Sequence, residues 1–316
     1  MRVAILGTGA LGGVIAGCLA DTGAGLVCVS RGRTAEILEG GLTIFTPEGT
    51  VEMIPRDRYV LIDSQRGPLN ETMCKSCDVA IIAGKADSTP ELSSIAEDIV
   101  SEGGVVVSIQ NGLGNSGIIA SRVGWERVVG GSTTHSAWRD SEGGVHWTSR
   151  GSMSIGKMDG SDPNPTEAEF VSLLDEAGLN PTWSSDINKE IWRKLMINVA
   201  INPICAIAGI RNGGLLEIPE LWIQSLEAMR EAENVARASG VDLGAMNIED
   251  YLRKVVTATS ENRVSMLQDL MAGRKTEIDV ICGAVISKGE ELGIKTPRNE
   301  VLLALVRGIE MSQNHD

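Results

Sequence analysis

Short apolar runs bounded by turn residues dominate the first half of the chain, and this pattern is typical of buried β-strands. Residues 2–6 (RVAIL) and 25–29 (GLVCV) are rich in β-branched side chains, and a helix-like run reaching about Thr22 separates them. Similar apolar runs predict further strands at residues 79–83, 104–109 and 128–134. Strands that alternate with helical segments favour a parallel, doubly wound sheet.

Two other stretches of this half have a different pattern. Residues 41–67 contain short alternating pieces around a Pro-Glu-Gly turn, which predict a small β excursion inserted into the wound sheet. The apolar pieces across residues 145–155 predict a β-hairpin. This half of the chain is therefore expected to be rich in β-structure.

Helical periodicity replaces the strand pattern after Asp186. Helices are predicted at residues 191–207, 223–239, 251–257, 264–271, 278–292 and 301–311. The predicted fold is therefore α/β, with a Rossmann-type N-terminal domain at residues 1–185 and an all-α C-terminal domain at residues 186–316.

The first helix of the C-terminal half carries a polar stripe. Lys194, Asn198 and Asn202 are spaced four residues apart, which places them on one helical face between apolar neighbours. A cation that can donate a proton, beside two amides, suits a small oxygen-rich substrate. The alternative is that the stripe simply faces water. Pro203 lacks a backbone donor, so the helix is expected to end or kink there.

A glycine-rich turn directly follows the first predicted strand. Its sequence, GTGALG, matches the GxGxxG pattern and stands between a strand and a helix, which is the order that gives this pattern its meaning. Glycines let backbone amides approach a pyrophosphate, and the helix N-terminus favours an anion. The alternative is an ordinary glycine turn. The predicted dinucleotide-binding residues are Gly7, Thr8, Gly9, Ala10, Leu11 and Gly12.

The residues after the second strand indicate which dinucleotide is bound. NAD-binding folds usually place Asp or Glu here to hold the ribose 2′-hydroxyl, whereas this chain has Arg31 and Arg33. Guanidinium groups suit a 2′-phosphate, and one charge-assisted contact of about 1.5–3 kcal/mol gives a roughly ten- to hundredfold preference. The predicted cofactor is therefore NADPH. The alternative is a solvent-facing loop of arginines.

Three further polar residues are candidates for the same site. Lys85 and Asn111 each follow a predicted parallel strand, and ligands of such sheets bind outside the carboxyl ends of the strands. Turn chemistry alone is the alternative explanation for Asn111. Glu277 lies at the start of a helix, with Thr276 as its expected N-cap. Glu277 therefore either serves the helix dipole alone or pairs with Lys194.

Composition narrows the classes of function. The 316 residues suffice for two domains, and a formal net charge of −14 argues against nucleic acid or an anionic membrane as partner. No apolar run reaches the ~18 residues of a membrane span and no signal peptide is visible, so a cytoplasmic location is expected. Cys74 and Cys77 form a CxxC without a second pair or a nearby histidine, so no metal site is expected.

Taken together, these motifs resemble those of the ketopantoate reductase family (2-dehydropantoate 2-reductases) over essentially the whole chain. The resemblance rests on GTGALG, Arg31, Lys85, QNGLG with Asn111, GGSTTHSA ending at Ala137, WRKLMINVAINP at 192–203, and SMLQD followed by GRKTEID. It implies a cleft between the two domains in which NADPH reduces ketopantoate to pantoate, on the route to pantothenate and coenzyme A. The chain departs from the family pattern at Gly84 and Val264.

The resemblance also implies roles for individual residues. Lys194 matches the family's general acid, and Glu277 matches a cofactor contact that would orient the lysine. Asn111 matches a residue that touches both cofactor and substrate. The remaining implied cofactor contacts are Arg31, Lys85 and Ala137, and the remaining implied substrate contacts are Asn198, Asn202, Asn212 and Ser265.

Two other functions stay open at this point. Because the chain departs from the family pattern at single positions, its substrate could be another branched 2-keto acid. A protein that senses NADPH and regulates a partner without turnover is the second alternative, although such a sensor needs no proton donor. A homodimer formed through the helical domain is also compatible with the sequence.

Overall fold

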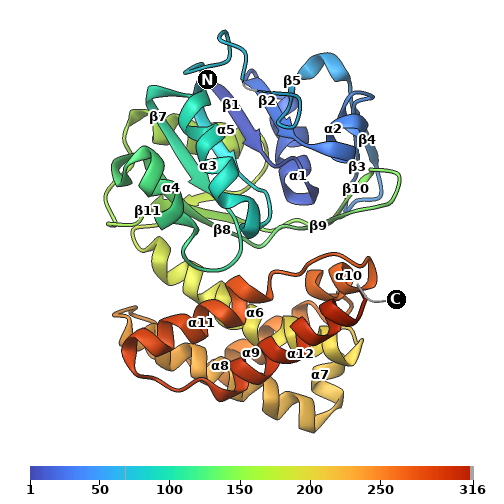
Figure 1. The fold of residues 1–316 in the computed structure, drawn as a ribbon, viewed down its shortest axis with the longest axis vertical. Helices are drawn as coiled ribbons and strands as arrows, with labels where there is room; N and C mark the ends of the chain where they lie inside the picture. Colours follow the sequence, from blue (N-terminus) through green and yellow to red (C-terminus); the bar gives the residue numbers. More distant parts are fainter. Residues whose placement is uncertain (68, 314–316) are drawn as a thin grey trace. The chain divides into compact units, whose positions relative to one another are not determined.

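The computed structural model describes residues 1–67 and 69–313 and divides the chain into two compact units (Figure 1). The first unit comprises Met1–Gln110 and Asn115–Ile187. The second comprises Asn111–Gly114 and the chain from Asn188 onward, so the division lies close to the expected boundary. The predicted α/β fold, with a Rossmann-type N-terminal part and a helical C-terminal part, is confirmed.

An eight-stranded sheet forms the centre of the first unit (Figure 1). Its order is β12-β11-β8-β7-β6-β1-β2-β5, and every pair is parallel except β8 with β11. The strands are β1 (Arg2–Leu6), β2 (Gly25–Ser30), β5 (Val60–Asp63), β6 (Cys77–Ile82), β7 (Val100–Ser108), β8 (Val128–Thr133), β11 (Met153–Lys157) and β12 (Pro181–Trp183). Alternate residues of β1 enter two different cores, as expected for a parallel strand that is buried on both faces.

The helices of the first unit pack around this sheet. They are α1 (Ala10–Ala20), α2 (Gly32–Leu38), α3 (Thr89–Ile99), α4 (Asn115–Val123) and α5 (Pro165–Glu176). Short 3-10 turns occur at η1 (Arg56–Arg58), η2 (Ala86–Ser88) and η3 (Trp125–Arg127). The predicted Rossmann-type fold implies helices such as α3, α4 and α5, but no residue range was predicted for them.

A second sheet, in the order β4-β3-β10-β9, changes the interpretation of residues 41–67. Its strands are β3 (Leu42–Phe45), β4 (Val51–Ile54), β9 (Ser136–Arg139) and β10 (Val145–Ser149). The predicted excursion into the wound sheet is therefore wrong in part. Strands β3 and β4 belong to the separate sheet, whereas β5, from the same stretch, joins the main sheet beside β2.

The hairpin predicted across residues 145–155 is wrong. Strand β10 pairs antiparallel with β9, and β11 pairs with β8 in the other sheet. The true hairpin is closed by Asp140, whose Oδ1 accepts hydrogen bonds from the backbone N–H groups of Glu142 and Gly144. This Asx-type turn sets the β9–β10 pairing, and apolar alternation alone does not show which neighbour a strand chooses.

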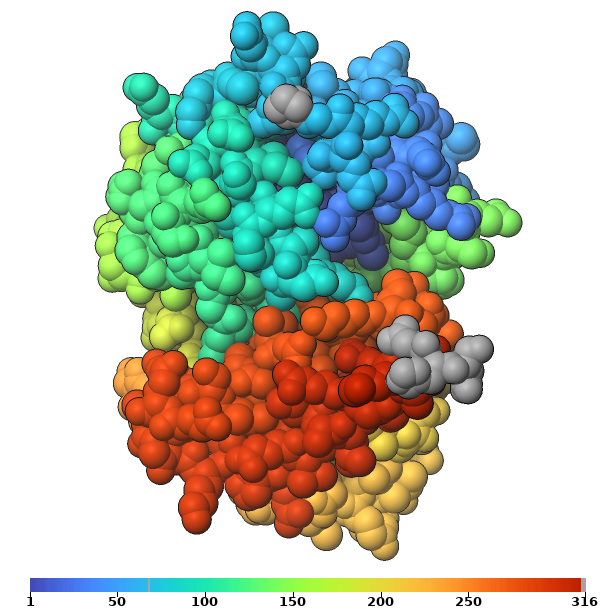
Figure 2. Space-filling view, in the orientation of Figure 1, coloured from blue at the N-terminus to red at the C-terminus, as the bar shows by residue number. Residues whose placement is uncertain are grey.

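The second unit is helical around one hydrophobic core, and α11 and α12 cover the face seen in Figure 2. Its helices are α6 (Ile187–Ala208), α7 (Gly214–Glu217), α8 (Pro219–Ala238), α9 (Ile248–Ala258), α10 (Ser265–Met271), α11 (Ile278–Leu292) and α12 (Pro297–Gln313). Helix α6 is long and apolar enough to span a membrane by composition, yet it supplies much of this core.

The helix that contains Pro203 was predicted to end or kink there. Helix α6 does not end at Pro203 but continues through it to Ala208. Proline removes one ladder hydrogen bond. The residues after Pro203, from Ile204 to Ala206, are buried in the helical core, and their packing holds the last turn in place.

Candidate active site

The turn between β1 and α1 has a conformation that only glycines allow. Gly7 has a φ of +90°, and its N–H donates to the Val29 carbonyl of β2 at 2.9 Å. A Cβ at Gly12 would lie 2.3 Å from the Gly7 carbonyl oxygen, and a Cβ at Gly7 would lie 2.5 Å from the backbone nitrogen of Gly84. The tight packing of the turn therefore requires both Gly7 and Gly12.

The second glycine of the motif, Gly9, leaves room for a ligand. Gly9 is the N-cap of α1, and a Cβ there would meet no atom within 4 Å. No side chain caps this helix, and its first turn contains no acidic residue. The N-terminal amides and the helix dipole therefore fit a pyrophosphate, with open space where it would approach.

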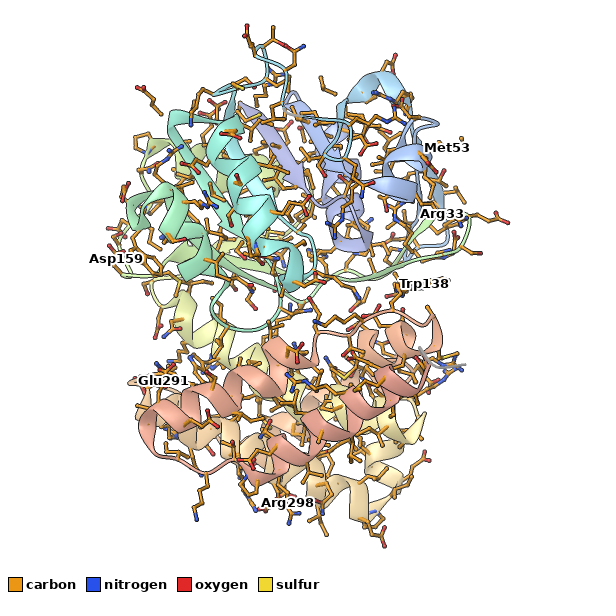
Figure 3. All side chains as sticks on the ribbon, in the orientation of Figure 1. Arg33, Met53, Trp138, Asp159, Glu291 and Arg298 are labelled. Atoms are coloured by element: carbon orange, nitrogen blue, oxygen red, sulfur yellow. The ribbon has the colours of Figure 1, made fainter. Side chains whose placement is uncertain are left out.

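Arg31, the predicted contact for a 2′-phosphate, lies at the end of β2. Its Nη1 forms an ion pair with Oε2 of Glu91 in α3 at 2.6 Å, and the Ser64 hydroxyl donates to the other carboxylate oxygen at 3.3 Å. Arg33 is exposed and donates to the Ser141 carbonyl (Figure 3). Sequence reasoning missed Glu91, because the contact joins residues 60 positions apart.

The turns after β6 and β7 are tied together by a residue that sequence reasoning also missed. Gln110 donates from Nε2 to the carbonyls of Gly84 at 2.9 Å and of the half-buried Lys85 at 3.2 Å. A Cβ at Gly84 would lie 2.6 Å from Cδ1 of Leu92, which explains the glycine at this position. Ala137, the remaining predicted cofactor contact, is half-buried in β9.

The polar stripe of α6 does not form a fully exposed face. Lys194, Asn198 and Asn202 are all half-buried. Burial lowers the pKa of Lys194 from 10.5 to about 8, and the charge of Glu277 raises this pKa by a smaller amount. The side chain therefore carries a proton at neutral pH that it can give up readily, as a general acid must.

Glu277 does more than serve the dipole of α11. Glu277 directly precedes α11 at its N-cap position, but its side chain makes no capping hydrogen bond. The capping contact comes from Thr276, the predicted N-cap one residue earlier, whose Oγ1 accepts a hydrogen bond from the Ile278 N–H at 3.2 Å. The Thr276 N–H donates to Oε1 of Glu310 at 2.7 Å. The Glu277 carboxylate accepts a hydrogen bond from Nδ2 of Asn111 at 2.8 Å.

The segment that follows β7 belongs to the helical unit. A Cβ at Gly112, which has a φ of +85°, would lie 2.3 Å from the carbonyl oxygen of Val280 in α11, so this turn packs directly against the start of that helix. The second unit thus groups Asn111, Lys194 and Glu277. Such a set combines a proton donor, a carboxylate that orients it and an amide.

The remaining predicted substrate contacts lie elsewhere in the second unit. Asn212 is buried after α6, and its Nδ2 donates to the Thr259 hydroxyl at 2.9 Å. Its Oδ1 is buried and has no hydrogen-bond partner within the part of the chain that the structure describes. Ser265 is the exposed first residue of α10. The structure does not join either residue to Lys194 by a hydrogen bond between described residues.

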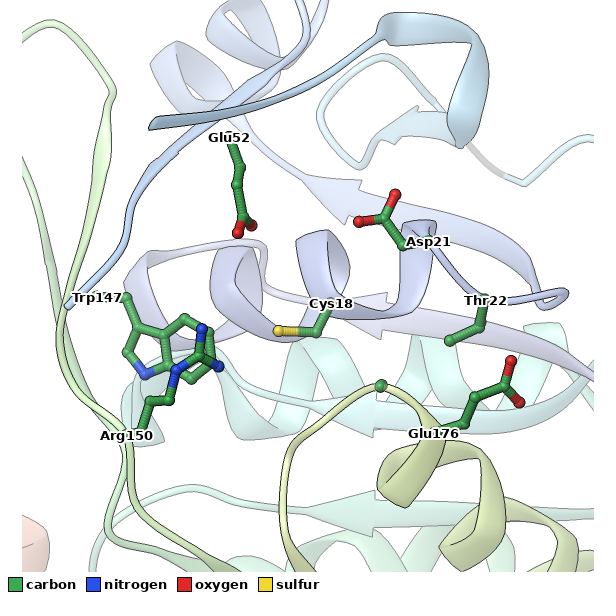
Figure 4. A pocket seen from close by; sticks show the side chains of 8 residues that line it. Cys18, Asp21, Thr22, Glu52, Trp147, Arg150 and Glu176 are labelled. Atoms are coloured by element: carbon green, nitrogen blue, oxygen red, sulfur yellow. The ribbon is translucent and has the colours of Figure 1, made fainter. Parts of the chain in front are cut away.

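A cavity of about 190 Å³ lies in the first unit (Figure 4). None of the residues that line it was predicted to bind the cofactor or the substrate. Burial raises the pKa of the Cys18 thiol in its wall to about 12, so this thiol is a poor nucleophile. The Arg150 guanidinium stacks 4.0 Å from the Trp147 ring and pairs with Glu48. Residues 1–67 and 69–313 hold no group of three or more His, Cys, Asp or Glu placed for a metal ion.

Comparison with known proteins identifies relatives over both units. The family model "Ketopantoate reductase PanE/ApbA" matches residues 3–160, and "Ketopantoate reductase PanE/ApbA C terminal" matches residues 186–310. The chain is 35% identical over 310 residues to the 2-dehydropantoate 2-reductase of Archaeoglobus fulgidus, which covers 98% of each chain.

Solved structures share the whole fold. A PanE/ApbA family ketopantoate reductase from Ralstonia eutropha JMP134 has a TM-score of 0.87 at 27% identity and covers 100% of both chains. A D-mandelate dehydrogenase solved with NADH and anilino(oxo)acetate has a TM-score of 0.85 at 24% identity, covering 99% of this chain and 100% of that one. At this identity the second likeness concerns the fold alone.

Proposed function

Because the chain belongs to the ketopantoate reductase family, we propose that it reduces ketopantoate to pantoate with NADPH. The observation that carries the proposal is Lys194, a half-buried lysine of lowered pKa in the same unit as Glu277 and Asn111. A protein that only sensed the nucleotide would have no use for such a proton donor.

The proposed chemistry divides the work between cofactor and protein. NADPH, when bound, supplies the hydride that reduces the 2-keto carbon. Negative charge then grows on the carbonyl oxygen, and Nζ of Lys194 stabilises this charge and delivers the proton, an effect of about 10²- to 10⁴-fold in rate. The amides of Asn198 and Asn202, with Asn212 and Ser265, are proposed to hold the substrate's carboxylate and hydroxyl.

The proposed cofactor contacts are the residues that the sequence motifs predicted. The glycine turn (residues 7–12) holds the pyrophosphate, Arg31 holds the 2′-phosphate, and Lys85 and Ala137 contact the nucleotide. Asn111 and Glu277 complete the set, and Glu277 also keeps the Lys194 ammonium oriented. The open Cβ direction at Gly9 and the uncapped start of α1 support the pyrophosphate assignment.

The pH dependence of the reaction follows from this assignment. The kcat/KM for keto acid reduction is expected to fall as the pH rises through about 8, because Lys194 loses the proton it must donate. In Glu277→Gln the carboxylate charge that raises the Lys194 pKa is gone, so the descending limb should move to lower pH. Initial rates of both proteins from pH 6 to 10 measure the two descending limbs, because this range covers about two pH units on either side of the lysine pKa.

The control for this shift is Glu290→Gln, which removes an exposed carboxylate near the other end of α11. The fall of kcat/KM with pH in this variant should coincide with that of the unaltered protein. A limb that does not move in Glu277→Gln would mean that Lys194 is not the titrating acid.

The substrate is tested by initial rates of NADPH oxidation with ketopantoate and a panel of other branched 2-keto acids. Ketopantoate should give the highest kcat/KM, because a site that binds its hydroxyl is left with unpaired polar groups by analogues that lack it. A higher kcat/KM with another keto acid would assign that compound instead. NADPH binding without oxidation by any keto acid would favour the sensing alternative.

Location and assembly are part of the same proposal. NADPH-dependent chemistry and six free cysteines, of which four are buried, fit the reducing environment of the cytoplasm. A small 2-keto acid is the proposed partner, with no role for nucleic acid or membrane in the reaction. A homodimer formed through the helical unit remains compatible with this function.

A further inference from the structure

Arg139, the last residue of β9, lies against the carbonyl side of the glycine turn. Its Nη2 donates to the carbonyl oxygens of Thr8 at 3.0 Å and Gly9 at 3.2 Å, and its Nη1 donates to the Gly143 carbonyl at 2.6 Å. The side chain therefore reaches from the four-stranded sheet to the turn that follows β1 of the eight-stranded sheet, within the first unit. Trp138, labelled in Figure 3, marks this strand.

The two carbonyls bound by Arg139 determine the orientation of two peptide groups. In a trans peptide the C=O and N–H bonds point in opposite directions within one plane. Holding the carbonyls of Thr8 and Gly9 on the Arg139 side therefore turns the N–H groups of Gly9 and Ala10 toward the opposite side. The Gly9 carbonyl also accepts from Gly13 at 2.9 Å, so it is shared between the helix and the guanidinium.

The chain makes room for this guanidinium. A Cβ at Gly13 would lie 3.2 Å from Nη2 of Arg139 and 2.9 Å from Cγ2 of Val145. All three hydrogen bonds described for the Arg139 side chain go to backbone carbonyls, which carry no net charge. The guanidinium is also partly buried, so its positive charge acts on the turn with less screening than that of an exposed arginine, and the neighbouring Asp140 carboxylate offsets part of it.

We propose that Arg139 is a positioning residue for the cofactor pyrophosphate, which aims the amides of the glycine turn and adds positive charge behind them. This inference rests on the proposed assignment of the glycine turn as the dinucleotide site. It predicts a contribution common to NADPH and NADH, since both contain the pyrophosphate. It predicts that Arg139 contributes nothing to the binding of adenosine 2′-monophosphate, because this compound has no pyrophosphate.

The test is direct binding without keto acid, by titration calorimetry with NADPH, NADH and adenosine 2′-monophosphate. In Arg139→Met the Kd values for NADPH and NADH should both rise at least about tenfold, whereas that for adenosine 2′-monophosphate should change less than about twofold. Arg139→Lys, which keeps the charge but loses the planar fork, should show a smaller rise for both dinucleotides.

Arg127→Met is the matched control. Arg127 is also half-buried and donates to two backbone carbonyls, those of Gly104 at 2.9 Å and Ser101 at 2.6 Å, away from the glycine turn. The loss of either arginine should lower the melting temperature, but the loss of Arg127 should leave the Kd for NADPH unchanged. The control thus separates a general loss of stability from a loss of pyrophosphate binding.

Three results would overturn the inference: an unchanged Kd for NADPH in both Arg139 variants, an equal loss of adenosine 2′-monophosphate binding, or an equal loss of NADPH binding in Arg127→Met. Should Arg139→Met fail to fold, as judged by circular dichroism, the lysine variant decides. Failure of the unaltered protein to bind NADPH would instead refute the assignment of the glycine turn.

Discussion

Replacing Lys194 with alanine is expected to lower kcat/KM for keto acid reduction by about 10²- to 10⁴-fold. The ammonium is the group proposed to neutralise charge on the carbonyl oxygen and to deliver the proton, and alanine can do neither. The Kd for NADPH should change less than about threefold, because the loss is confined to the transition state. Steady-state kinetics with ketopantoate and a separate NADPH titration measure the two quantities.

Lys189→Ala provides the control for this variant. Lys189 is a half-buried lysine of the same helix, α6, and lies outside the proposed set. Its replacement should leave kcat/KM near that of the unaltered protein. Turnover by Lys194→Ala at the unaltered rate would remove the lysine from the mechanism, and an equal loss in both variants would point to damage to the helix.

Replacing Arg31 with alanine is expected to weaken NADPH binding roughly ten- to hundredfold, the effect of one lost charge-assisted contact to phosphate. NADH binding should change much less, because NADH has no 2′-phosphate for this guanidinium to contact. The ratio of the two Kd values, measured by fluorescence titration, reports the change in preference.

The ion pair with Glu91 and the neighbouring Arg33 both bear on this experiment. The Arg31 guanidinium is paired with Glu91, so a 2′-phosphate must share or replace this carboxylate. Arg33→Ala, which removes the neighbouring exposed guanidinium, should leave the Kd ratio nearly unchanged. Equal losses for NADPH and NADH in Arg31→Ala would exclude a phosphate contact, and a larger effect in Arg33→Ala would transfer the role to that residue.

Local patterns were sufficient for the parts of this protein whose structure depends on near neighbours. The strands β1, β2, β6 and β8 and the helices α6 and α8 to α12 follow from apolar periodicity, whereas the short helix α7 was not predicted. The glycine turn follows from its order between a strand and a helix. The stripe of α6 follows from a four-residue spacing, because a helix repeats every 3.6 residues whatever surrounds it.

Contacts between distant residues required the tertiary structure. The partner of β10 was decided by the Asp140 turn, and the continuation of α6 beyond Pro203 was decided by packing. The pKa of Lys194 depends on burial and on Glu277, which lies far along the chain.

By itself, the amino-acid sequence determined the fold class, the glycine turn between β1 and α1 and the residue types available for chemistry, since each follows from short-range spacing. Only the tertiary structure decided that Glu277 accepts from Asn111, that Arg31 pairs with Glu91 and that Arg139 lies behind the glycine turn. These contacts join side chains that spacing cannot relate, because chain separation says nothing of distance once the chain is folded.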